Sequence, residues 1–285
     1  MATVEKPKAT SFEYGESYQN NQLEKYHNRD SNHWRFRVEL AHRLVDEHCL
    51  PRLRDKSAGE IVVVDVGCSI GTFAIEFAKA GFRAYGIDFD RHALELAEQL
   101  AREEGATATF LHGDVAEWTA HSEPIDIAIC FDLFEHLHDD ELGALLQSLR
   151  RQLSPQGTLV FHTYPTQYIY LILNRWVKRV MGPIRSLPPA QFDRVLRAIA
   201  SLYDFASIVR TNTTRQDRIK MEGHCNPTTM DRLSDILARA GYDIVHIEYA
   251  QLYPQNSRYL QQFLHQPLSH QNLFGVAVPR ASATH

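Results

Sequence analysis

The sequence predicts an α/β fold in which a mostly parallel β-sheet carries helices on both faces. Short apolar runs rich in β-branched residues alternate with helical segments between residues 61 and 164, as in repeated β-α-β units. The first run, IVVVDV, is apolar almost throughout, which is typical of a strand buried on both faces. Gly81 and Gly105 stand where two helical patterns stop, and glycine is a common helix ending.

A helix is expected before the sheet. Apolar residues recur at helical spacing in segment 33–50, namely Trp34, Val38, Ala41, Leu44 and Val45. Pro51 is expected to stop this helix, because proline lacks the N–H that a helix interior needs. Residues 1–20 are polar and are expected to be frayed. We therefore treat residues 1–54 as an N-terminal helical segment.

The first five strands and their connecting helices follow in order. The strands are expected at 61–66, 82–88, 107–114, 125–132 and 158–164. The helices between them are expected at 71–81, 91–105 and 139–153. The last of these helices has an acidic first turn and a basic last turn, which suits the helix dipole. Pro155 and Gly157 are expected to form the turn into the fifth strand.

The alternation breaks at residues 165–223, which contain helical, aromatic and basic stretches without a clear strand. This segment is expected to be a helical insertion that acts as a lid, a substrate contact or a dimer contact. A helix and two strands are expected after it, at 227–241, 242–250 and 272–279. The core therefore spans 55–164 and 224–280.

Composition and charge restrict the class of partner. The chain is 44% hydrophobic and carries a formal net charge of -5, which argues against a nucleic-acid-binding protein. The four cysteines form no C-x-x-C pair, and neither a signal peptide nor an apolar run long enough to span a membrane is evident. A cytoplasmic enzyme is expected. Peripheral membrane contact through Arg175, Lys178 and Arg179 and a homodimer remain open alternatives.

A glycine-containing turn follows the first strand. It reads Asp65-Val66-Gly67-Cys68-Ser69-Ile70-Gly71, and glycines at such a turn let the backbone approach a ligand beside the N-terminus of the next helix. The second strand ends at Asp88, at a distance suited to an acid that binds ribose hydroxyls. Ser69 and Thr72 stand where the dinucleotide fingerprint has glycine, which disfavours NAD.

Five segments together resemble the motifs of class I S-adenosylmethionine-dependent methyltransferases. They are VVVDVGCSIGTFAIEFA, YGIDFD, LHGDVAEW, IDIAICFDLFEHLHDD and QLSPQGTLVF. The resemblance implies a Rossmann-like sheet of seven strands with the last one antiparallel. It also implies that Asp88 binds the ribose, that Asp114 faces the adenine amino group and that Val115 flanks the adenine ring. The full implied cofactor set is Asp65, Gly67, Cys68, Gly71, Asp88, Phe89, Asp114, Val115 and Phe131. Ser69 departs from the glycine that the family often has there.

The segment after the fourth strand, Asp132-Leu-Phe-Glu135-His136, carries the densest chemistry. If it is helical, its two carboxylates and its imidazole share one face. A similar pattern occurs in ubiquinone-pathway O-methyltransferases and in small-RNA 2′-O-methyltransferases, some of which use a divalent metal. Asp132, Glu135 and His136 are therefore candidate metal ligands, although the family usually has Glu where this chain has Asp132. The alternative is that Glu135 and His136 only pack around the cofactor.

A general base is needed if the acceptor is protonated, and histidine is the usual candidate. His136 is the first candidate for the catalytic residue, His224 is the second, and His162 is a further candidate. Tyr14, Tyr18, Tyr26 and His27 precede the first expected helix and are candidates for the pocket wall, since this segment often covers the cofactor in the family.

We interpret the chain as an enzyme that transfers a methyl group from S-adenosylmethionine to an oxygen or nitrogen of a small molecule of natural-product, quinone or sugar type. One alternative is an RNA-end 2′-O-methyltransferase with a divalent metal. A second is a non-catalytic cofactor-binding module, and a third is a dehydrogenase that uses the same first strand.

Overall fold

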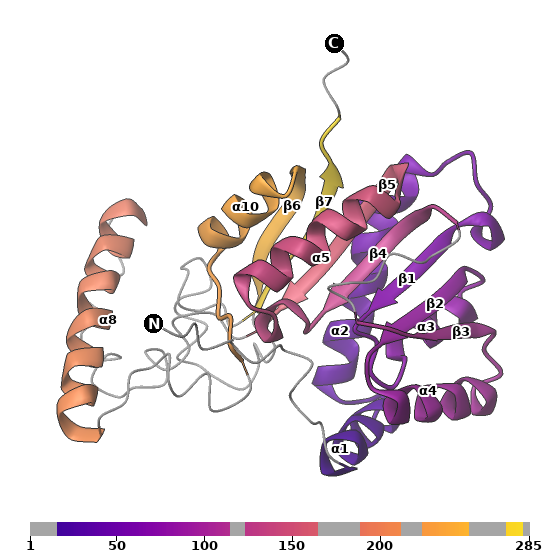
Figure 1. Cartoon of the computed structure of the whole chain (residues 1–285), viewed down its shortest axis with the longest axis horizontal. Helices are drawn as coiled ribbons and strands as arrows, with labels where there is room; N and C mark the ends of the chain where they lie inside the picture. The colour runs from indigo at the N-terminus through magenta and orange to yellow at the C-terminus, as the bar shows by residue number, and fades with distance from the viewer. Residues whose placement is uncertain (1–15, 115–122, 165–188, 212–223, 251–271, 282–285) are drawn as a thin grey trace, which may run out of the picture.

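The central element is a seven-stranded sheet with the order β3-β2-β1-β4-β5-β7-β6 (Figure 1). The computed structural model describes residues 16–114, 123–164, 189–211, 224–250 and 272–281. The strands are β1 Val62–Val66, β2 Arg83–Asp88, β3 Ala108–His112, β4 Ile125–Phe131, β5 Leu153–Thr163, β6 Tyr242–Ala250 and β7 Asn272–Pro279. The first five strands are parallel, and β7 runs antiparallel between β5 and β6. This confirms the predicted fold class.

Helices cover both faces of the sheet (Figure 1). They are α2 Asn32–Leu44, α3 Thr72–Lys79, α4 Arg91–Glu103, α5 Asp139–Gln152 and α10 Met230–Arg239. One face packs against α5 and α10 through buried leucines such as Leu145, Leu149 and Leu237. The opposite face packs against α2 and α3 through Leu44 and Phe77. The strand order reverses between β1 and β4, and in open α/β sheets ligands bind beyond the carboxyl ends of strands at such a point.

The N-terminal segment differs from the prediction in two ways. Residues 16–27 form helix α1, where a frayed segment was predicted up to residue 20. Its buried side chains are Gln19 and Tyr26, so no apolar periodicity marks the helix in the sequence. The helix predicted at 33–50 is α-helical only to Leu44 and continues as a π-turn, Val45–Cys49, and a 3-10 turn, Leu50–Arg52. Pro51 lies inside that last turn rather than after the helix.

Strand β5 begins earlier than predicted. Leu153 pairs with Ile125 and Thr158 pairs with Ile127, so four residues are inserted between two successive pairings. The Pro155–Gly157 turn therefore interrupts the strand instead of preceding it. A Cβ at Gly157 would lie 2.9 Å from two backbone carbonyl oxygens, so the irregularity requires glycine.

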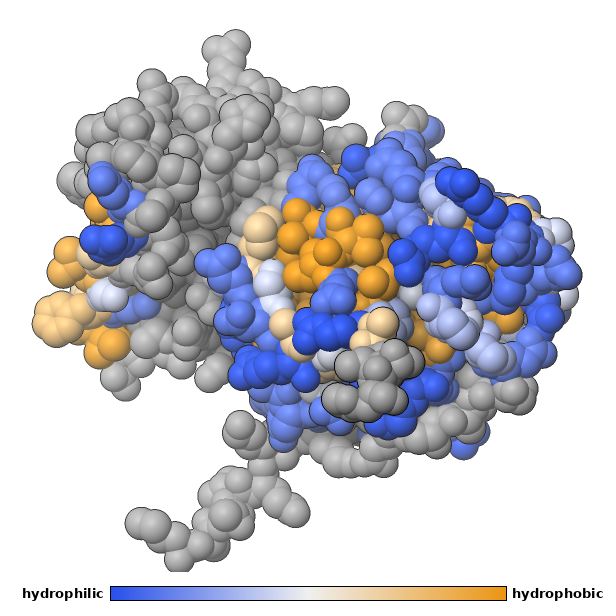
Figure 2. Space-filling model, turned by 90° about the horizontal axis from the view of Figure 1, so that it is seen from above, coloured by the Kyte–Doolittle hydropathy of each residue, from blue (hydrophilic) through white to orange (hydrophobic). Residues whose placement is uncertain are grey.

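Helix α8, Pro189–Thr211, is the part of the predicted insertion that the structure describes. Its apolar side chains reach the surface, as the orange atoms at the left of Figure 2 show, and the most exposed are Leu202, Phe205 and Val209. The roles predicted for 165–223 depend largely on residues outside the described ranges. Across the described helices, none combines the length and hydropathy needed to cross a bilayer.

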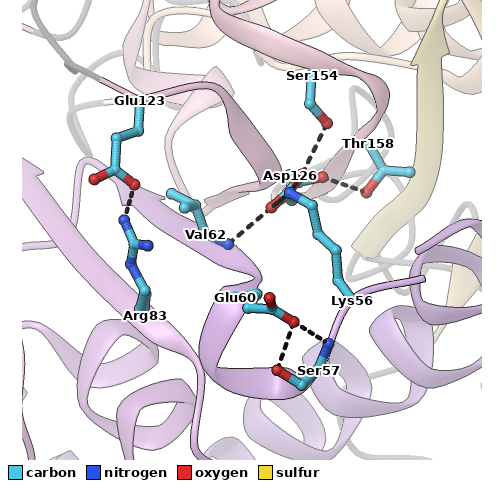
Figure 3. Close-up of polar contacts among 9 residues, drawn as sticks. All are labelled: Lys56, Ser57, Glu60, Val62, Arg83, Glu123, Asp126, Ser154 and Thr158. Carbon is cyan, nitrogen blue, oxygen red and sulfur yellow. Dashed lines mark hydrogen bonds and ion pairs between the residues drawn. The ribbon is translucent and has the colours of Figure 1, made fainter. Parts of the chain in front are cut away.

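A fully buried carboxylate, Asp126, joins the amino ends of three strands (Figure 3). Lys56 Nζ donates to both carboxylate oxygens at 2.8 and 2.7 Å. The Val62 amide and the Ser154 hydroxyl donate to the same group at 3.0 and 2.8 Å. The Thr158 hydroxyl donates to the Asp126 carbonyl oxygen at 3.5 Å. This edge of the sheet is thus held by a carboxylate with donors on all sides, opposite to the edge where a ligand is expected.

We expect Asp126→Ala to lower the free energy of unfolding by about 3 kcal/mol, because it leaves an amide and a hydroxyl buried without their acceptor. Urea unfolding followed by circular dichroism measures the change. Asp243→Ala is the matched control, since Asp243 is an exposed aspartate paired with Arg280 and its loss should change stability by less than about 1 kcal/mol. Equal small losses for both variants would contradict the assigned role.

Candidate functional site

The turn from β1 into α3 contains three residues with left-handed backbone in a stretch of five. The φ angles are +72° at Gly67, +48° at Ser69 and +77° at Gly71. A Cβ at Gly71 would lie 2.5 Å from Phe110 Cε1, so glycine is needed there for space as well as for conformation. Ser69 is a non-glycine residue in a strained region, and such strain is concentrated at functional sites. The requirement for φ > 0 explains why the family often has glycine there.

Two buried carboxylates flank this turn. Asp65 is the penultimate residue of β1, is 2% exposed and accepts a hydrogen bond from the Ala74 amide at 3.3 Å. Burial raises the pKa of Asp65 to about 7. Asp88 ends β2 and accepts hydrogen bonds from the Ser69 amide at 2.7 Å and the Asp90 amide at 3.0 Å. Burial also raises the pKa of Asp88, against the lowering effect of these amides.

A pocket opens beside the turn, between the sheet and helices α1, Glu16–His27, and α2. Aromatic side chains make up much of its wall, and both acidic and basic groups reach it. The lining residues are Tyr18, Gln22, Lys25, Tyr26, Trp34, Arg37, Val38, Asp65, Gly67, Cys68, Ser69, Ile70, Thr72, Phe73, Phe131 and Asp132.

Five of the predicted site residues line this pocket, namely Asp65, Gly67, Cys68, Phe131 and Asp132. Gly71, Asp88, Phe89 and Asp114 lie along the continuation of the same edge. Asp88 bonds to Ser69 in the pocket wall, and its carbonyl oxygen accepts from the Gly113 amide next to Asp114. The Phe89 carbonyl lies 3.0 Å from His112 Nε2. Val115 falls outside the described residues.

Gln22, Lys25 and Arg37 line the pocket but were not predicted. Lys25 belongs to α1, which the sequence pattern did not reveal. Burial and the nearby Arg37 lower the pKa of Lys25. Tyr18, on the same helix, was a candidate for the pocket wall and does line it, and burial raises its pKa to about 12. The single signal for Arg37 in the sequence is its position one helical turn after Trp34 and beside Val38, on the buried side of α2.

Asp132 faces Arg37 and His162 rather than the other candidate metal ligands. Arg37 Nε and Nη2 donate to its two carboxylate oxygens at 2.5 and 3.1 Å. His162 Nδ1 lies 2.8 Å from Asp132 Oδ1, and His162 itself is completely buried. Burial acts to raise the pKa of Asp132, but Arg37 and His162 outweigh it and hold that pKa well below the ordinary value. His162 does not line the pocket.

Glu135, His136 and His224 form a second group. Their possible ligand atoms all lie within 4.8 Å of one another, and the two imidazole rings are 5.1 Å apart. The predicted metal trio thus keeps Glu135 and His136 but has His224 in the place of Asp132. Glu135 is buried and accepts from the Thr163 hydroxyl at 2.8 Å. Burial, reinforced by the charge of Asp132, raises its pKa well above the ordinary value.

Two hydrogen bonds bring His224 to this group. The Cys225 thiol donates to the His136 carbonyl at 3.1 Å, and the Asn226 amide donates to the Glu135 carbonyl at 2.9 Å. Residues 134–136 form one 3-10 turn rather than a longer helix. These two bonds hold the segment that begins at His224 against the turn after β4, so His136 and His224 meet although almost ninety positions separate them.

The sheet order is that of a Rossmann-like fold, and the left-handed turn and the two carboxylates lie at the end of the sheet where such folds bind ligands. Residues 63–157 match the family model of a methyltransferase domain. This match agrees with the motifs of the sequence, which lie in the same part of the chain.

The curated relatives carry names that agree with this domain. The chain is 32% identical over 106 residues to a ubiquinone biosynthesis O-methyltransferase from Actinobacillus pleuropneumoniae. The aligned region covers 35% of this chain and 44% of that protein. The chain is also 29% identical over 162 residues to the protein of the same name from Histophilus somni, where the aligned region covers 53% and 65%. The chain thus spans about half the length of curated relatives that it matches.

Solved structures agree on the fold. An S-adenosylmethionine-dependent methyltransferase from Clostridium acetobutylicum superposes with a TM-score of 0.56 at 9% identity, over 92% of this chain and 99% of that one. A TehB-like SAM-dependent methyltransferase from Corynebacterium glutamicum gives 0.52 at 13% identity, over 93% and 100%.

The pKa of Asp65 predicts that binding of a cationic cofactor depends on pH. Because that pKa is raised to about 7, part of the population is protonated at neutral pH, and a cation binds the ionised form better. We expect affinity for S-adenosylmethionine to fall about tenfold between pH 8 and pH 6, with proton release on binding near pH 7. Calorimetry in buffers of different ionisation enthalpy measures both. Asp65→Asn should bind more weakly and lose this pH dependence, and an unchanged profile in Asp65→Asn would refute the assignment.

Proposed function

We propose that this protein transfers a methyl group from S-adenosylmethionine to an oxygen or nitrogen atom of a small-molecule acceptor. The observation that carries the proposal is the pocket beside the β1–α3 turn, at the point where the strand order reverses, within the segment that matches a methyltransferase domain. The acceptor class draws on the relatives, whose name describes an O-methyltransferase of a small molecule. A hydroxyl acceptor is therefore the first choice.

The charges around the pocket suit the parts of this cofactor. Asp88 is placed at the end of β2 to accept hydrogen bonds from the ribose hydroxyls, with Asp114 further along the same edge for the adenine amino group. Asp65 is the carboxylate nearest the turn for the ammonium group of the methionine part. Lys25 and Arg37 bring positive charge to the other wall of the pocket, which suits the carboxylate of that same part.

Methyl transfer from a sulfonium is an in-line displacement. The acceptor oxygen forms a bond to the methyl carbon while the sulfur–carbon bond breaks, and its electron pair returns to sulfur. The cation loses its charge in the transition state, so positioning and exclusion of water do much of the work. Aromatic surface in the pocket wall comes from Phe131, Phe73 and Tyr18. The rings of Phe73 and Phe131 contact each other edge to face, with their centroids 4.8 Å apart.

A hydroxyl acceptor must also lose its proton, and we assign this role to His136 or His224. Both are partly exposed, both lie beyond the end of β4, and their rings are in contact. Each neutral imidazole can accept one proton from the attacking hydroxyl. His162 is assigned another role, because it is completely buried and both ring nitrogens face protein oxygens.

The group Glu135, His136 and His224 also has the donor set of a divalent-metal site, with two imidazole nitrogens and one carboxylate. A bound cation would offset the raised pKa of Glu135 and would acidify a hydroxyl acceptor directly. This is the second candidate for activation of the acceptor, and it uses His136 and His224 as ligands rather than as bases.

Binding of S-adenosylhomocysteine tests the cofactor assignment. We expect micromolar affinity by isothermal titration of the dialysed protein, no binding of NAD⁺ and at least a tenfold loss of affinity in Asp88→Ala, because the ribose hydroxyls lose their acceptor. Asp90→Ala is the neighbouring control for altered charge and should change the affinity less. Clear binding of NAD⁺ without binding of S-adenosylhomocysteine would overturn the proposed function.

Substitution of the two histidines tests how the acceptor is activated. We expect His136→Asn and His224→Asn to bind S-adenosylhomocysteine within about threefold of the wild type but to lose about 100-fold or more of turnover, as for removal of a general base. Turnover is followed as S-adenosylhomocysteine formed with a panel of hydroxylated aromatic acceptors. His92→Asn, an exposed histidine on α4, is the control and should retain turnover.

Metal analysis separates the two mechanisms. Turnover that survives dialysis against EDTA, with no metal retained, supports the base. Turnover that is lost and then restored by Mg²⁺, Mn²⁺ or Zn²⁺ supports the metal site. Full turnover in both histidine variants would contradict both mechanisms.

A further inference from the structure

We propose that His162 and Asn272 are positioning residues that hold Asp132, and through it Arg37, in the wall of the cofactor pocket. Asp132 and Arg37 line the pocket, whereas His162 and Asn272 do not. The four side chains come from α2, β4, β5 and β7 and form one continuous polar chain. This inference rests on the proposed function, since it assigns a purpose to a contact beside the proposed cofactor.

Asp132 needs external support because its backbone is strained. Its φ is +52°, a left-handed conformation that is unfavourable for a non-glycine residue and persists when neighbouring contacts enforce it. The Asp132 amide donates to the His162 carbonyl at 3.0 Å, which fixes the backbone at the end of β4. The side chain is then directed at once toward Arg37 and toward the His162 ring.

Arg37 is held as a fork. Its Nε and Nη2 reach different oxygens of Asp132, at 2.5 and 3.1 Å, and its side chain is only 12% exposed. A two-point contact of this kind fixes the plane of the guanidinium as well as its position. Arg37 is the cation of α2 that reaches the pocket, so the orientation of Asp132 sets where that positive charge lies.

His162 contacts Asp132 from the protein interior, outside the pocket lining. The imidazole is 0% exposed, with Nδ1 2.8 Å from Asp132 Oδ1 and Nε2 2.9 Å from Asn272 Oδ1. The rings of Phe36 and Phe131 close against it at centroid distances of 6.0 and 5.3 Å. Asn272 is also fully buried, and its contact with Nε2 fixes the ring in the orientation that points Nδ1 at Asp132.

Packing alone does not require these residue types. Apolar side chains of similar volume would fill the space between β5, β7 and α2, and buried polar groups are unfavourable unless they are fully bonded. Asn272 is the first residue of β7, the antiparallel strand inserted between β5 and β6. Through His162 of β5, the C-terminal strand β7 thus acts on Asp132, a pocket residue that directly follows β4 at the switch point of the sheet.

The affinity for S-adenosylhomocysteine, measured by calorimetry, tests this inference. We expect Asn272→Leu, which has nearly the same size, to weaken binding about tenfold. Asn272→Asp, which keeps an oxygen acceptor at the same place, should restore affinity to within about threefold of the wild type. His246→Phe is the control, because His246 is another ring beside Phe274 in the neighbouring strand and should leave affinity unchanged.

A double-variant cycle distinguishes positioning from general loss of structure. If Asn272 acts through Arg37, then Arg37→Leu with Asn272→Leu should bind no more weakly than Arg37→Leu alone. Additive losses, or unchanged affinity in Asn272→Leu, would overturn the inference. Asn272→Ala is judged by the same criteria if Asn272→Leu does not fold. Failure of the wild type to bind S-adenosylhomocysteine would instead overturn the proposed function, and this inference with it.

Discussion

The backbone of the turn between β1 and α3 is the constraint on which the site depends. Three left-handed residues within five turn the chain sharply enough for α3 to start directly beyond the strand. That conformation aims the Ser69 amide at the Asp88 carboxylate, and so locks the end of β2 to the end of β1. A side chain at Gly71 would push against Phe110 of β3, so three adjacent strands keep their relative positions through one glycine. Pocket shape and carboxylate placement follow from this turn.

Much of this arrangement was predictable because it is local in sequence. Strand and helix bounds in the sheet region agree within one to three residues for most elements, since apolar runs and glycine stops report buried strands and helix ends directly. The placement of Asp65 and Asp88 follows from the same reasoning, because each is one of the last two residues of a parallel strand. These predictions needed only the order of the elements and the rule that carboxyl ends of parallel strands meet at one edge.

What the sequence did not reveal depends on contacts between distant segments. Helix α1 buries Gln19 and Tyr26 rather than an apolar stripe, so its stability comes from tertiary contacts such as the edge-to-face pair of Tyr26 with Trp34. The partner of Asp132 is Arg37, 95 positions earlier, and no spacing rule links them. Equally, the grouping of His136 with His224 arises from two hydrogen bonds to the turn after β4, one from the Cys225 thiol and one from the Asn226 backbone amide.

Buried acids have different surroundings at the two ends of the parallel strands, and this difference supports the proposed function. At the amino edge, the Asp126 carboxylate accepts hydrogen bonds from a lysine, an amide and a hydroxyl, so groups of the protein itself balance its charge. At the carboxyl edge, Asp65, Asp88 and Glu135 are buried, and burial raises the pKa of each, whereas Asp132 is paired with the Arg37 guanidinium. Such an edge is destabilising by itself, because buried carboxylates without cations disfavour the charged form. A ligand that brings positive charge and several donors relieves this, and a ligand that binds only the folded state also stabilises it. The sulfonium and ammonium groups of S-adenosylmethionine bring positive charge, and its hydroxyl and ammonium groups bring donors. The buried carboxylates that destabilise this end of the sheet therefore favour binding of the proposed cofactor.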